Sequence, residues 1–293
     1  MYFPNLGDLS ILGKTDSNSF LKSTVDWCEI NYNTSDILAE FWNSISGIAI
    51  MISAITFRIK YKDLFVDSIN NIRNNNNEYI TQVNGINNIF ILLCITSIGT
   101  ILFHGTLLFP FQLLDEIPMV LIAIEYLKIL INLKIFNIAF SSIVNRFFNK
   151  IINICFNSIF YIPIIYFISH TLQILTFHII LKILEVSIVY IIYVYNLYYN
   201  EFVYQYIYTR YSSNQLVLIH KLCLYKNYKE DMKKSLNIGK NVYILSITFW
   251  VLEKFFCDKL EWIQLHAWWH IFSSVGIFYL NRSIRCKILI DSL

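Results

Sequence analysis

The chain has 293 residues, of which 56% are hydrophobic and only 15% are charged, and its mean hydropathy is +0.51. This composition excludes a disordered chain and a coiled coil, and it is typical of a protein embedded in a lipid bilayer. The formal net charge of +3 is too small to indicate nucleic-acid binding. We therefore expect an all-α integral membrane protein that contacts membrane lipids, without nucleic acid or an obligate protein partner.

Seven segments are apolar and long enough to cross the hydrocarbon core of a bilayer, which is roughly 30 Å thick, as α-helices. They predict a seven-transmembrane helix bundle over 37–284, preceded by an N-terminal segment (1–36) and followed by a short tail (285–293). The longer intervals are 58–85, which is polar and rich in Asn, and 199–239, which holds many Tyr and Lys; we expect both to be loops, unless the second begins as a continuation of the fifth helix. The predicted spans are 37–57, 86–104, 112–133, 151–169, 172–198, 240–257 and 264–284.

The distribution of Lys and Arg predicts the orientation of this bundle. If the N-terminus is luminal or extracellular, 17 of these residues lie in or beside cytosolic segments and only four lie on the opposite side. The C-terminus is then cytosolic. Met1–Val25 lack an apolar stretch behind a basic start, so we expect the first helix to act as a signal anchor without a cleavable signal peptide.

Cysteine placement follows from this topology. Of the six cysteines, only Cys28 and Cys257 reach the oxidising side of the membrane. These two residues could form a disulfide, or they could be two partly buried thiols.

Histidines at the ends of two predicted helices form the strongest chemical pattern. His266 and His270 are four residues apart, so they share one helical face and could bind one metal ion. Such a pair also occurs as ordinary buried polar residues. The second predicted helix ends at His104, at the same depth and on the same membrane face. Because three imidazoles with an open fourth position are typical of a catalytic zinc site, we expect zinc here.

Carboxylates accompany these histidines near the same membrane face. Asp115, near the start of the third predicted helix, is the candidate general base, or alternatively the partner that orients a ligating His. We expect Glu116 and Glu253 to have structural or orienting roles. We expect no functional role for the remaining histidines, which are His170, His178 and His220.

A second cluster lies in and beside the N-terminal segment. Four carboxylates and one amide occur close together with almost no cation nearby, so the carboxylates would repel one another unless they held a hard cation. Calcium prefers such oxygen ligands. A solvated acidic segment with helix-capping carboxylates explains the same composition. The residues are Asp26, Glu29, Asn31, Asp36 and Glu40.

Several segments, spread from the first to the seventh predicted helix, carry a resemblance that covers nearly the whole chain. They are Asp26–Tyr32, Ile37–Asn43, Phe103–His104, Gln112–Pro118, Phe249–Trp250 and His266–His270. In this order they resemble the alkaline ceramidase family, which is part of a wider superfamily of seven-helix metallohydrolases.

The resemblance implies hydrolysis of the amide of ceramide to sphingosine and a free fatty acid within the membrane, by a multi-pass protein of the endoplasmic reticulum or Golgi. It implies a zinc ion held by His104, His266 and His270, with Asp115 assisting the attacking water. It also implies a calcium ion. The implied calcium ligands are Asp26, the backbone carbonyl of Trp27, Glu29, Asn31 and Glu40.

One position departs from the family pattern. The residue four places before the first zinc-binding His is usually Ser, and here it is Thr100. The change keeps the hydroxyl, which could polarise the substrate, and adds a methyl group. Alternatively, the hydroxyl donates to the backbone carbonyl of residue 96 or 97, as Thr commonly does in membrane helices.

Two other functions fit parts of this pattern. One is a different lipid hydrolase on the same scaffold. The other is a seven-helix receptor or transport protein in which the metals are only structural, and a fourth protein ligand on the zinc would favour it.

Overall fold

The structure, a computed structural model, describes residues 22–62, 64–65, 77–131 and 203–293. Most of these residues are helical, residues 22–40 are not, and the described residues contain no β-strand beyond one isolated bridge. The predicted spans 151–169 and 172–198 lie outside the described residues. The helices are α1 (Phe41–Lys60), α3 (Asn77–Thr106), α4 (Phe109–Ile131), α9 (Gln215–Leu260), the short 3-10 helix η3 (Glu261–Ile263) and α10 (Leu265–Asp291).

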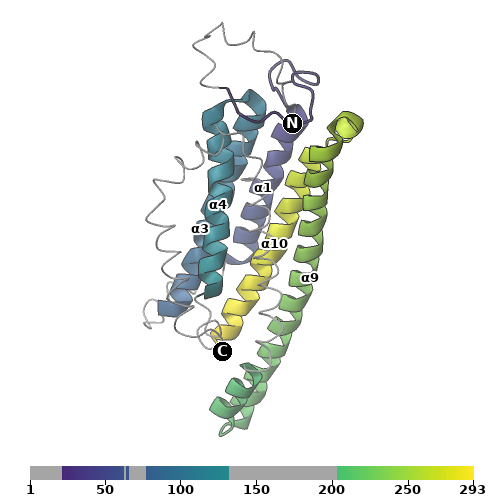
Figure 1. The fold of residues 1–293 in the computed structure, drawn as a ribbon. Coiled ribbons are helices and arrows are strands. Elements are labelled where there is room, and N and C mark those ends of the chain that lie inside the picture. Colours follow the sequence, from purple (N-terminus) through teal and green to yellow (C-terminus); the bar gives the residue numbers. More distant parts are fainter. Residues whose placement is uncertain (1–21, 63, 66–76, 132–202) are drawn as a thin grey trace, which may run out of the picture.

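The long helices lie side by side along one axis (Figure 1). Helix α3 packs against α4 and α1, α1 packs against α10, and α10 packs against α9. The first described residues and the start of α1 lie at the upper end of Figure 1, whereas the chain ends near the lower end. The start of α10 and the end of α9 also lie at the upper end. Segments that are far apart in the sequence are therefore brought together there.

Glycines allow α9 and α10 to pack closely. A Cβ atom at Gly239 of α9 would lie 3.2 Å from the carbonyl oxygen of Gly276, and a Cβ atom at Gly276 of α10 would lie 3.1 Å from Tyr243. Small residues at such crossings let the backbones approach, which is how helices commonly pack in membranes. The α9–α10 pair is therefore packed at the backbone level.

Two helices, α1 and the Tyr79–Thr106 part of α3, are long and apolar enough to cross a membrane by length and composition. One face of α1 also carries a row of isoleucines that are between 41% and 67% exposed. Their spacing of three or four residues places them in one stripe along the helix, which suits contact with lipid. The isoleucines are Ile45, Ile48, Ile52, Ile55 and Ile59.

The polar intervals are more helical than we expected from the sequence. Helix α9 runs from Gln215 to Leu260 and residues 203–211 are helical, so the prediction of a loop over 199–239 was wrong over most of its length. Helix α3 begins at Asn77, inside the other predicted loop, and α10 continues to Asp291, through most of the predicted tail. A hydropathy window detects lipid-facing helices, and it misses helices whose exposed faces carry Lys and Tyr.

Candidate metal centre

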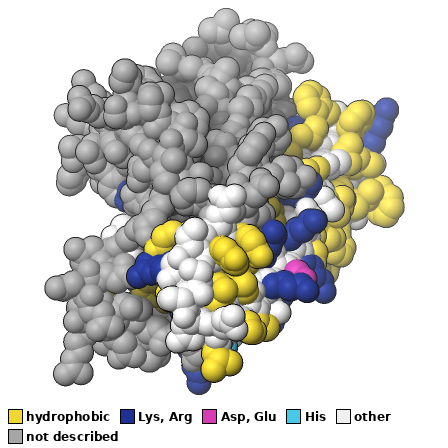
Figure 2. All heavy atoms as spheres, turned by 90° about the horizontal axis from the view of Figure 1, so that it is seen from below, with side chains coloured by type: hydrophobic (Ala, Val, Ile, Leu, Met, Phe, Trp, Pro, Cys, Tyr) yellow, Lys and Arg dark blue, Asp and Glu magenta, His cyan; other side chains and the backbone are white. Residues whose placement is uncertain are grey.

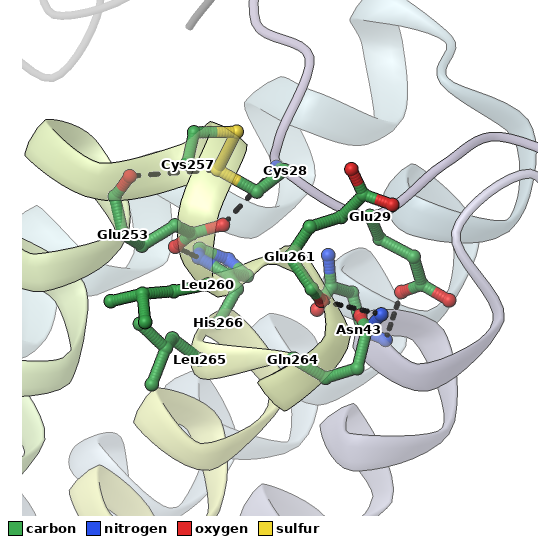
Figure 3. A pocket seen from close by; sticks show the side chains of 10 residues that line it. All are labelled: Cys28, Glu29, Asn43, Glu253, Cys257, Leu260, Glu261, Gln264, Leu265 and His266. Atoms are coloured by element: carbon green, nitrogen blue, oxygen red, sulfur yellow. Dashed lines mark hydrogen bonds and ion pairs between the residues drawn. A yellow bond between two sulfur atoms is a disulfide. The ribbon is translucent and has the colours of Figure 1, made fainter.

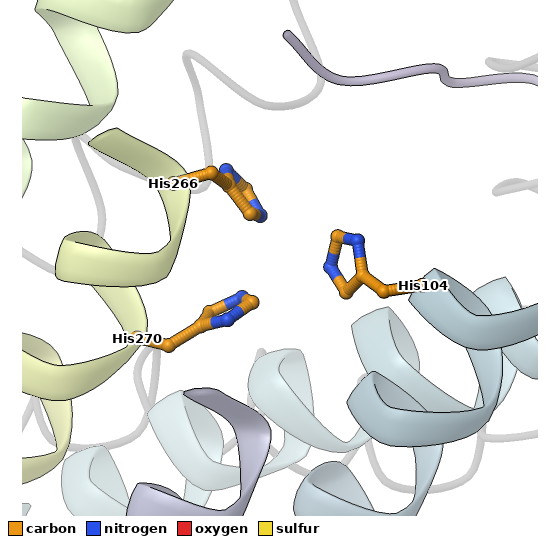
Figure 4. A group of neighbouring side chains, drawn as sticks. All are labelled: His104, His266 and His270. Atoms are coloured by element: carbon orange, nitrogen blue, oxygen red, sulfur yellow. The ribbon is translucent and has the colours of Figure 1, made fainter. Parts of the chain in front are cut away.

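Three histidines from two helices meet at the upper end of the bundle. His104 lies in the last turn of α3, and His266 and His270 lie on one face of the first turns of α10. All three side chains are buried, and their potential ligand atoms all lie within 4.8 Å of one another. Their rings face a common point (Figure 4). Such a spacing suits simultaneous coordination of one ion.

Each imidazole has a hydrogen-bonding partner at Nδ1. An Nδ1–H donor held in this way fixes the ring orientation and the tautomer, and it makes Nε2 the ligating nitrogen. Nε2 of His104 is buried and has no hydrogen-bond partner among the described residues, as expected for a metal ligand. The Nδ1 contacts are His104 to Glu40, His266 to Glu253 at 2.9 Å, and His270 to Ser46 at 2.7 Å.

The tautomer of His270 follows from the hydrogen bonds of its partner. The Ser46 hydroxyl donates its single proton to the backbone carbonyl of Asn43 at 2.8 Å. With the proton directed at that carbonyl, the hydroxyl oxygen accepts a hydrogen bond from Nδ1 of His270, which lies 2.7 Å away. In this arrangement the lone pair of the imidazole lies on Nε2, which is the form a zinc ligand requires.

Thr100 and Asp115 lie beside this cluster. Oγ1 of Thr100, which is fully buried, contacts Oδ1 of Asp115 and also lies 2.9 Å from the carbonyl oxygen of Thr96. Both sequence-based alternatives for Thr100 are thus present, although one hydroxyl proton can serve only one acceptor at a time. The extra methyl group fits because Gly47 faces it, and a Cβ atom at residue 47 would lie 3.0 Å from Cγ2. Asp115 also interacts electrostatically with His104.

A close crossing of α3 and α4 brings Thr100 to Asp115. A Cβ atom at Gly99 would lie 2.5 Å from the backbone of Leu114 and Asp115, so only glycine permits this approach. Pro118 of α4 contributes, because its missing N–H leaves the carbonyl of Leu114 without a helical donor. The close crossing and the missing helical hydrogen bond therefore lie next to the contact between Asp115 and Thr100.

Three of the predicted calcium ligands lie close together. Nδ2 of Asn31 donates to both carboxylate oxygens of Asp26, at 3.1 and 3.2 Å, and Asp26 interacts electrostatically with Glu40. Oδ1 of Asn31 is buried without a hydrogen-bond partner among the described residues. The backbone N–H of Trp27 donates to Oε1 of Glu40 at 3.0 Å, whereas Oε2 of Glu40 contacts His104. Glu40 thus connects this cluster to the histidines.

Glu29 has a different environment from the one we expected. Its two carboxylate oxygens accept hydrogen bonds from the backbone N–H groups of Trp42 and Asn43, at 2.8 and 2.9 Å, so it caps the first turn of α1. Burial raises the pKa of Glu29 and the pKa of Asp26, since a desolvated carboxylate is less stable than its neutral form. Asp36 is exposed. A helix-capping carboxylate and a cluster of side-chain oxygens therefore coexist in this segment.

A disulfide joins Cys28 to Cys257, with a Cα–Cα distance of 5.4 Å. It connects the N-terminal segment to the end of α9. The backbone N–H of Cys28 also donates to Oε1 of Glu253 at 3.2 Å, while the other oxygen of Glu253 accepts from His266. This covalent link therefore helps to hold the carboxylate that orients one imidazole.

Three contacts of the histidines were not apparent from the sequence, and the first is that of Glu40 with His104, since we expected Glu40 only as a calcium ligand. Ser46 is a small polar residue within a predicted span, and nothing in its spacing connected it to His270. Trp27 stacks on His266 with ring centroids 3.9 Å apart, although we expected only its backbone carbonyl to matter. Glu253 was expected to be structural or orienting, and an ionisable group in an apolar span was the signal for it.

The remaining candidates lie apart from the histidine cluster or support it indirectly. Glu116 is buried and accepts from Nε2 of Gln112 at 3.1 Å, and Gln112 in turn accepts from the backbone of Thr24 at 2.9 Å. These contacts hold the N-terminal segment against α4. His220 lies exposed on α9, and the two other histidines, His170 and His178, fall outside the described residues.

Comparison with known proteins shows which family this chain belongs to. A family model described as Ceramidase matches residues 20–290. The chain belongs to the ceramidase family. This ceramidase-type hydrolase is 25% identical, over 290 residues that cover 91% of it and 87% of the relative, to a Dictyostelium discoideum protein named "putative alkaline ceramidase dcd3A".

Two further relatives carry the same kind of name. The alkaline ceramidase YPC1 of Saccharomyces cerevisiae is 24% identical over 290 residues, which cover 90% of this chain and 76% of the relative. Alkaline ceramidase 3 of Mus musculus is 34% identical over 99 residues, which cover 33% of this chain and 31% of the relative. The match to YPC1, like the family model, extends over nearly the whole chain.

Proposed function

We propose that this ceramidase is a zinc-dependent amide hydrolase that cleaves ceramide to sphingosine and a free fatty acid within the membrane, with modulation by calcium. The observation that carries the proposal is the buried cluster of His104, His266 and His270, whose Nδ1 atoms are all occupied by orienting partners. Three neutral imidazoles that present Nε2 to one point match the donor set of catalytic zinc.

A zinc ion at this position would polarise the amide carbonyl and make a water molecule more acidic. Asp115 acts as the general base, since it lies beside the histidines and can take a proton from the attacking water. The water oxygen bonds to the carbonyl carbon, and the C–N bond then breaks. Asp115 returns its proton to the departing nitrogen, so the products are the fatty acid and the long-chain amine.

Thr100 orients Asp115 through the contact between its hydroxyl and Oδ1. The same hydroxyl can donate to the oxyanion that develops on the carbonyl oxygen, provided that it turns away from Thr96. Thr100 therefore takes part in the reaction through its hydroxyl, at a position where the family usually has Ser.

Calcium modulation rests on the position of Glu40. One of its carboxylate oxygens contacts His104, and the carboxylate also interacts with Asp26. A calcium ion bound by Asp26, Asn31, Glu40 and the carbonyl of Trp27 would fix the orientation of Glu40 and so of His104. Glu29 would then support the ion indirectly, through its cap on α1, or would turn to join it.

The membrane placement is also part of the proposal. We infer a seven-span protein of the endoplasmic reticulum or Golgi with a luminal N-terminus, because basic residues accumulate at the end of the bundle opposite the histidines. The exposed isoleucine stripe of α1 then faces lipid. In this placement the histidines lie near the luminal interface, at the depth of the amide bond of a membrane ceramide.

The decisive experiment combines metal analysis with product analysis. The full chain, purified in detergent, should contain about one zinc ion and should release fatty acid from defined ceramides. His104→Ala should lose both zinc and activity, whereas His220→Ala, the same change on an exposed part of α9, should change neither. Retention of zinc by a variant lacking all three histidines would contradict the proposal. Release of fatty acid only from other lipids would instead indicate a different hydrolase on this scaffold.

A further inference from the structure

A pocket is lined in part by His266, one of the three clustered histidines (Figure 3). Its enclosed volume is about 10 Å³, roughly enough for one group of the size of a water molecule or an ammonium, and it has an open mouth. The disulfide between Cys28 and Cys257 borders it on one side, and η3 with the first turn of α10 borders it on another. Its polar lining comes from Glu29, Asn43, Glu253, Glu261, Gln264 and His266.

The hydrogen-bond donors of this lining are already used within the protein. The side-chain amide N–H of Asn43 donates to Glu40 at 2.9 Å, and that of Gln264 donates to the backbone carbonyl of Glu261 at 3.0 Å. Nδ1 of His266 is engaged by a carboxylate, as described above. Neither Lys nor Arg lines the pocket. The lining therefore offers few donors to a bound molecule.

Acceptors, in contrast, remain unpaired. Oδ1 of Asn43 and Oε1 of Gln264 are both buried without a hydrogen-bond partner among the described residues, and Asn43 itself is fully buried. No hydrogen bond or ion pair links the carboxylate of Glu261 to another described side chain. Buried acceptors without donors cost free energy, so this arrangement favours a ligand that supplies N–H or O–H groups and positive charge.

We propose that this pocket binds the primary ammonium group of the long-chain base that amide hydrolysis releases. The inference rests on the proposed function, because that reaction generates the amine beside His266. Water supplies the hydroxyl of the acid and one proton of the amine, and the proton of the new carboxylic acid completes the ammonium group. The ammonium has three N–H donors and no acceptor, which complements Asn43, Gln264 and Glu261.

The nitrogen of the intact amide substrate lacks this complementarity, and the nitrogen is the only donor of the long-chain base that hydrolysis changes. An amide nitrogen carries one N–H at most and no charge, so it gains little from a pocket of acceptors. The pocket therefore discriminates between product and substrate, and it draws the polar end of the product toward the open mouth. Glu253 and Glu29 already accept hydrogen bonds from N–H groups of the protein. Glu261 therefore contributes most to the preference for a charged ammonium over a neutral nitrogen.

The test measures equilibrium binding of sphingosine to the full chain in detergent, which does not depend on turnover. Glu261→Gln should weaken sphingosine binding about three- to tenfold, the scale of one partly exposed charge pair. Asp258→Asn, a matched change at an exposed acid one turn earlier that does not line the pocket, should leave binding unchanged. N,N,N-trimethylsphingosine, which keeps the charge but has no N–H donor, should bind wild type at least about tenfold more weakly.

Several results would overturn the inference. Equal affinity of wild type and Glu261→Gln for sphingosine would reject the pocket, as would equal affinity of wild type for the trimethylated base. A change in calcium affinity without a change in sphingosine affinity would show a cation site instead. If Glu261 controls sphingosine binding but wild type does not hydrolyse ceramide, the proposed function fails and the pocket stands. If wild type hydrolyses ceramide and Glu261→Gln binds sphingosine normally, only the pocket fails.

Discussion

The two ends of the helical bundle use their polar side chains in different ways. At the upper end of Figure 1, buried carboxylates and hydroxyls converge on three imidazoles. At the lower end, roughly 20 Å further along α10, guanidinium groups lie over aromatic rings. Arg58 lies 3.5 Å from the ring centre of Phe65, and Arg285 lies 4.4 Å from that of Tyr61.

Charge also distinguishes the two ends. Figure 2 views the molecule from below, and among its coloured side chains Lys and Arg prevail over Asp and Glu. In the proposed function the upper end carries out the chemistry, because its polar groups are buried and directed at one point. In the proposed membrane placement the basic lower end sets the orientation, since cations flanking an apolar helix orient it in a membrane.

Among the variants that test this difference between the two ends, the largest effect is expected at Thr100. Thr100→Val keeps the shape but removes the hydroxyl, so turnover should fall about ten- to a thousandfold, the scale of losing one donor that stabilises the transition state. Thr100→Ser should retain most activity. Zinc content should be unchanged in both variants, which steady-state kinetics and metal analysis can check together. Near-normal turnover of the Val variant would remove Thr100 from the mechanism.

A smaller effect is expected at Glu253, which accepts from the backbone of Cys28 with one oxygen and from His266 with the other. Glu253→Gln leaves one acceptor oxygen for two donors, the backbone N–H of Cys28 and Nδ1 of His266. The orientation of the imidazole is therefore less well held. Zinc affinity should fall about ten- to a hundredfold, measured by competition with a chelator. Glu230→Gln, at an exposed position of the same helix, is the control. Unchanged affinity would separate Glu253 from the metal centre.

Calcium binding should depend on pH. Burial raises the pKa of Asp26 and of Glu29, so these carboxyl groups keep their protons to a higher pH than ordinary carboxyls do. Calcium must displace those protons, so its affinity should fall as the pH falls through these raised pKa values, by at most about tenfold per pH unit for each proton displaced. Calcium titrations of activity between pH 8 and about 5 test this. The dependence should flatten in Asp26→Asn, and an equally steep dependence there would exclude Asp26 as its source.

The smallest effect is expected at the lower end. Asp231 forms an ion pair with Arg282 in which each side chain is 28% exposed. Because solvent screens such a pair, Asp231→Asn should lower the free energy of unfolding by only about 0.5–1 kcal/mol. Thermal unfolding in detergent measures this, and zinc content and hydrolysis should not change. A loss of activity comparable with that of Glu253→Gln would contradict the functional separation of the two ends.

Much of the site could be predicted because its residues mark helix ends. The spacing of His266 and His270 placed them on one helical face. The position of His104 at the end of an apolar segment placed it at the same end of the bundle. The orienting groups were harder to predict. Ser46 and Glu40 lie far from the histidines in sequence, and their contacts depend on how α1 is rotated and inclined against α3 and α10.

The length of α9 shows why part of the fold escaped prediction. Residues 215–239 are rich in Lys and Tyr, so a membrane-length apolar window does not include them. The segment is nevertheless helical, because Tyr225, Met232 and Leu236 recur at helical spacing and are buried. The signal for this helix was a row of apolar residues on one helical face, which a hydropathy average over all faces does not detect.

By itself, the sequence determined that the described part of this protein is helical, and it determined which ionisable residues lie near one end of those helices. Composition and periodicity decide such matters locally, residue by residue. Only the tertiary structure decided which atoms meet. The tautomers of the histidines, the capping role of Glu29 and the acceptor-lined pocket all depend on distances between different helices, and sequence spacing constrains distances only within one helix.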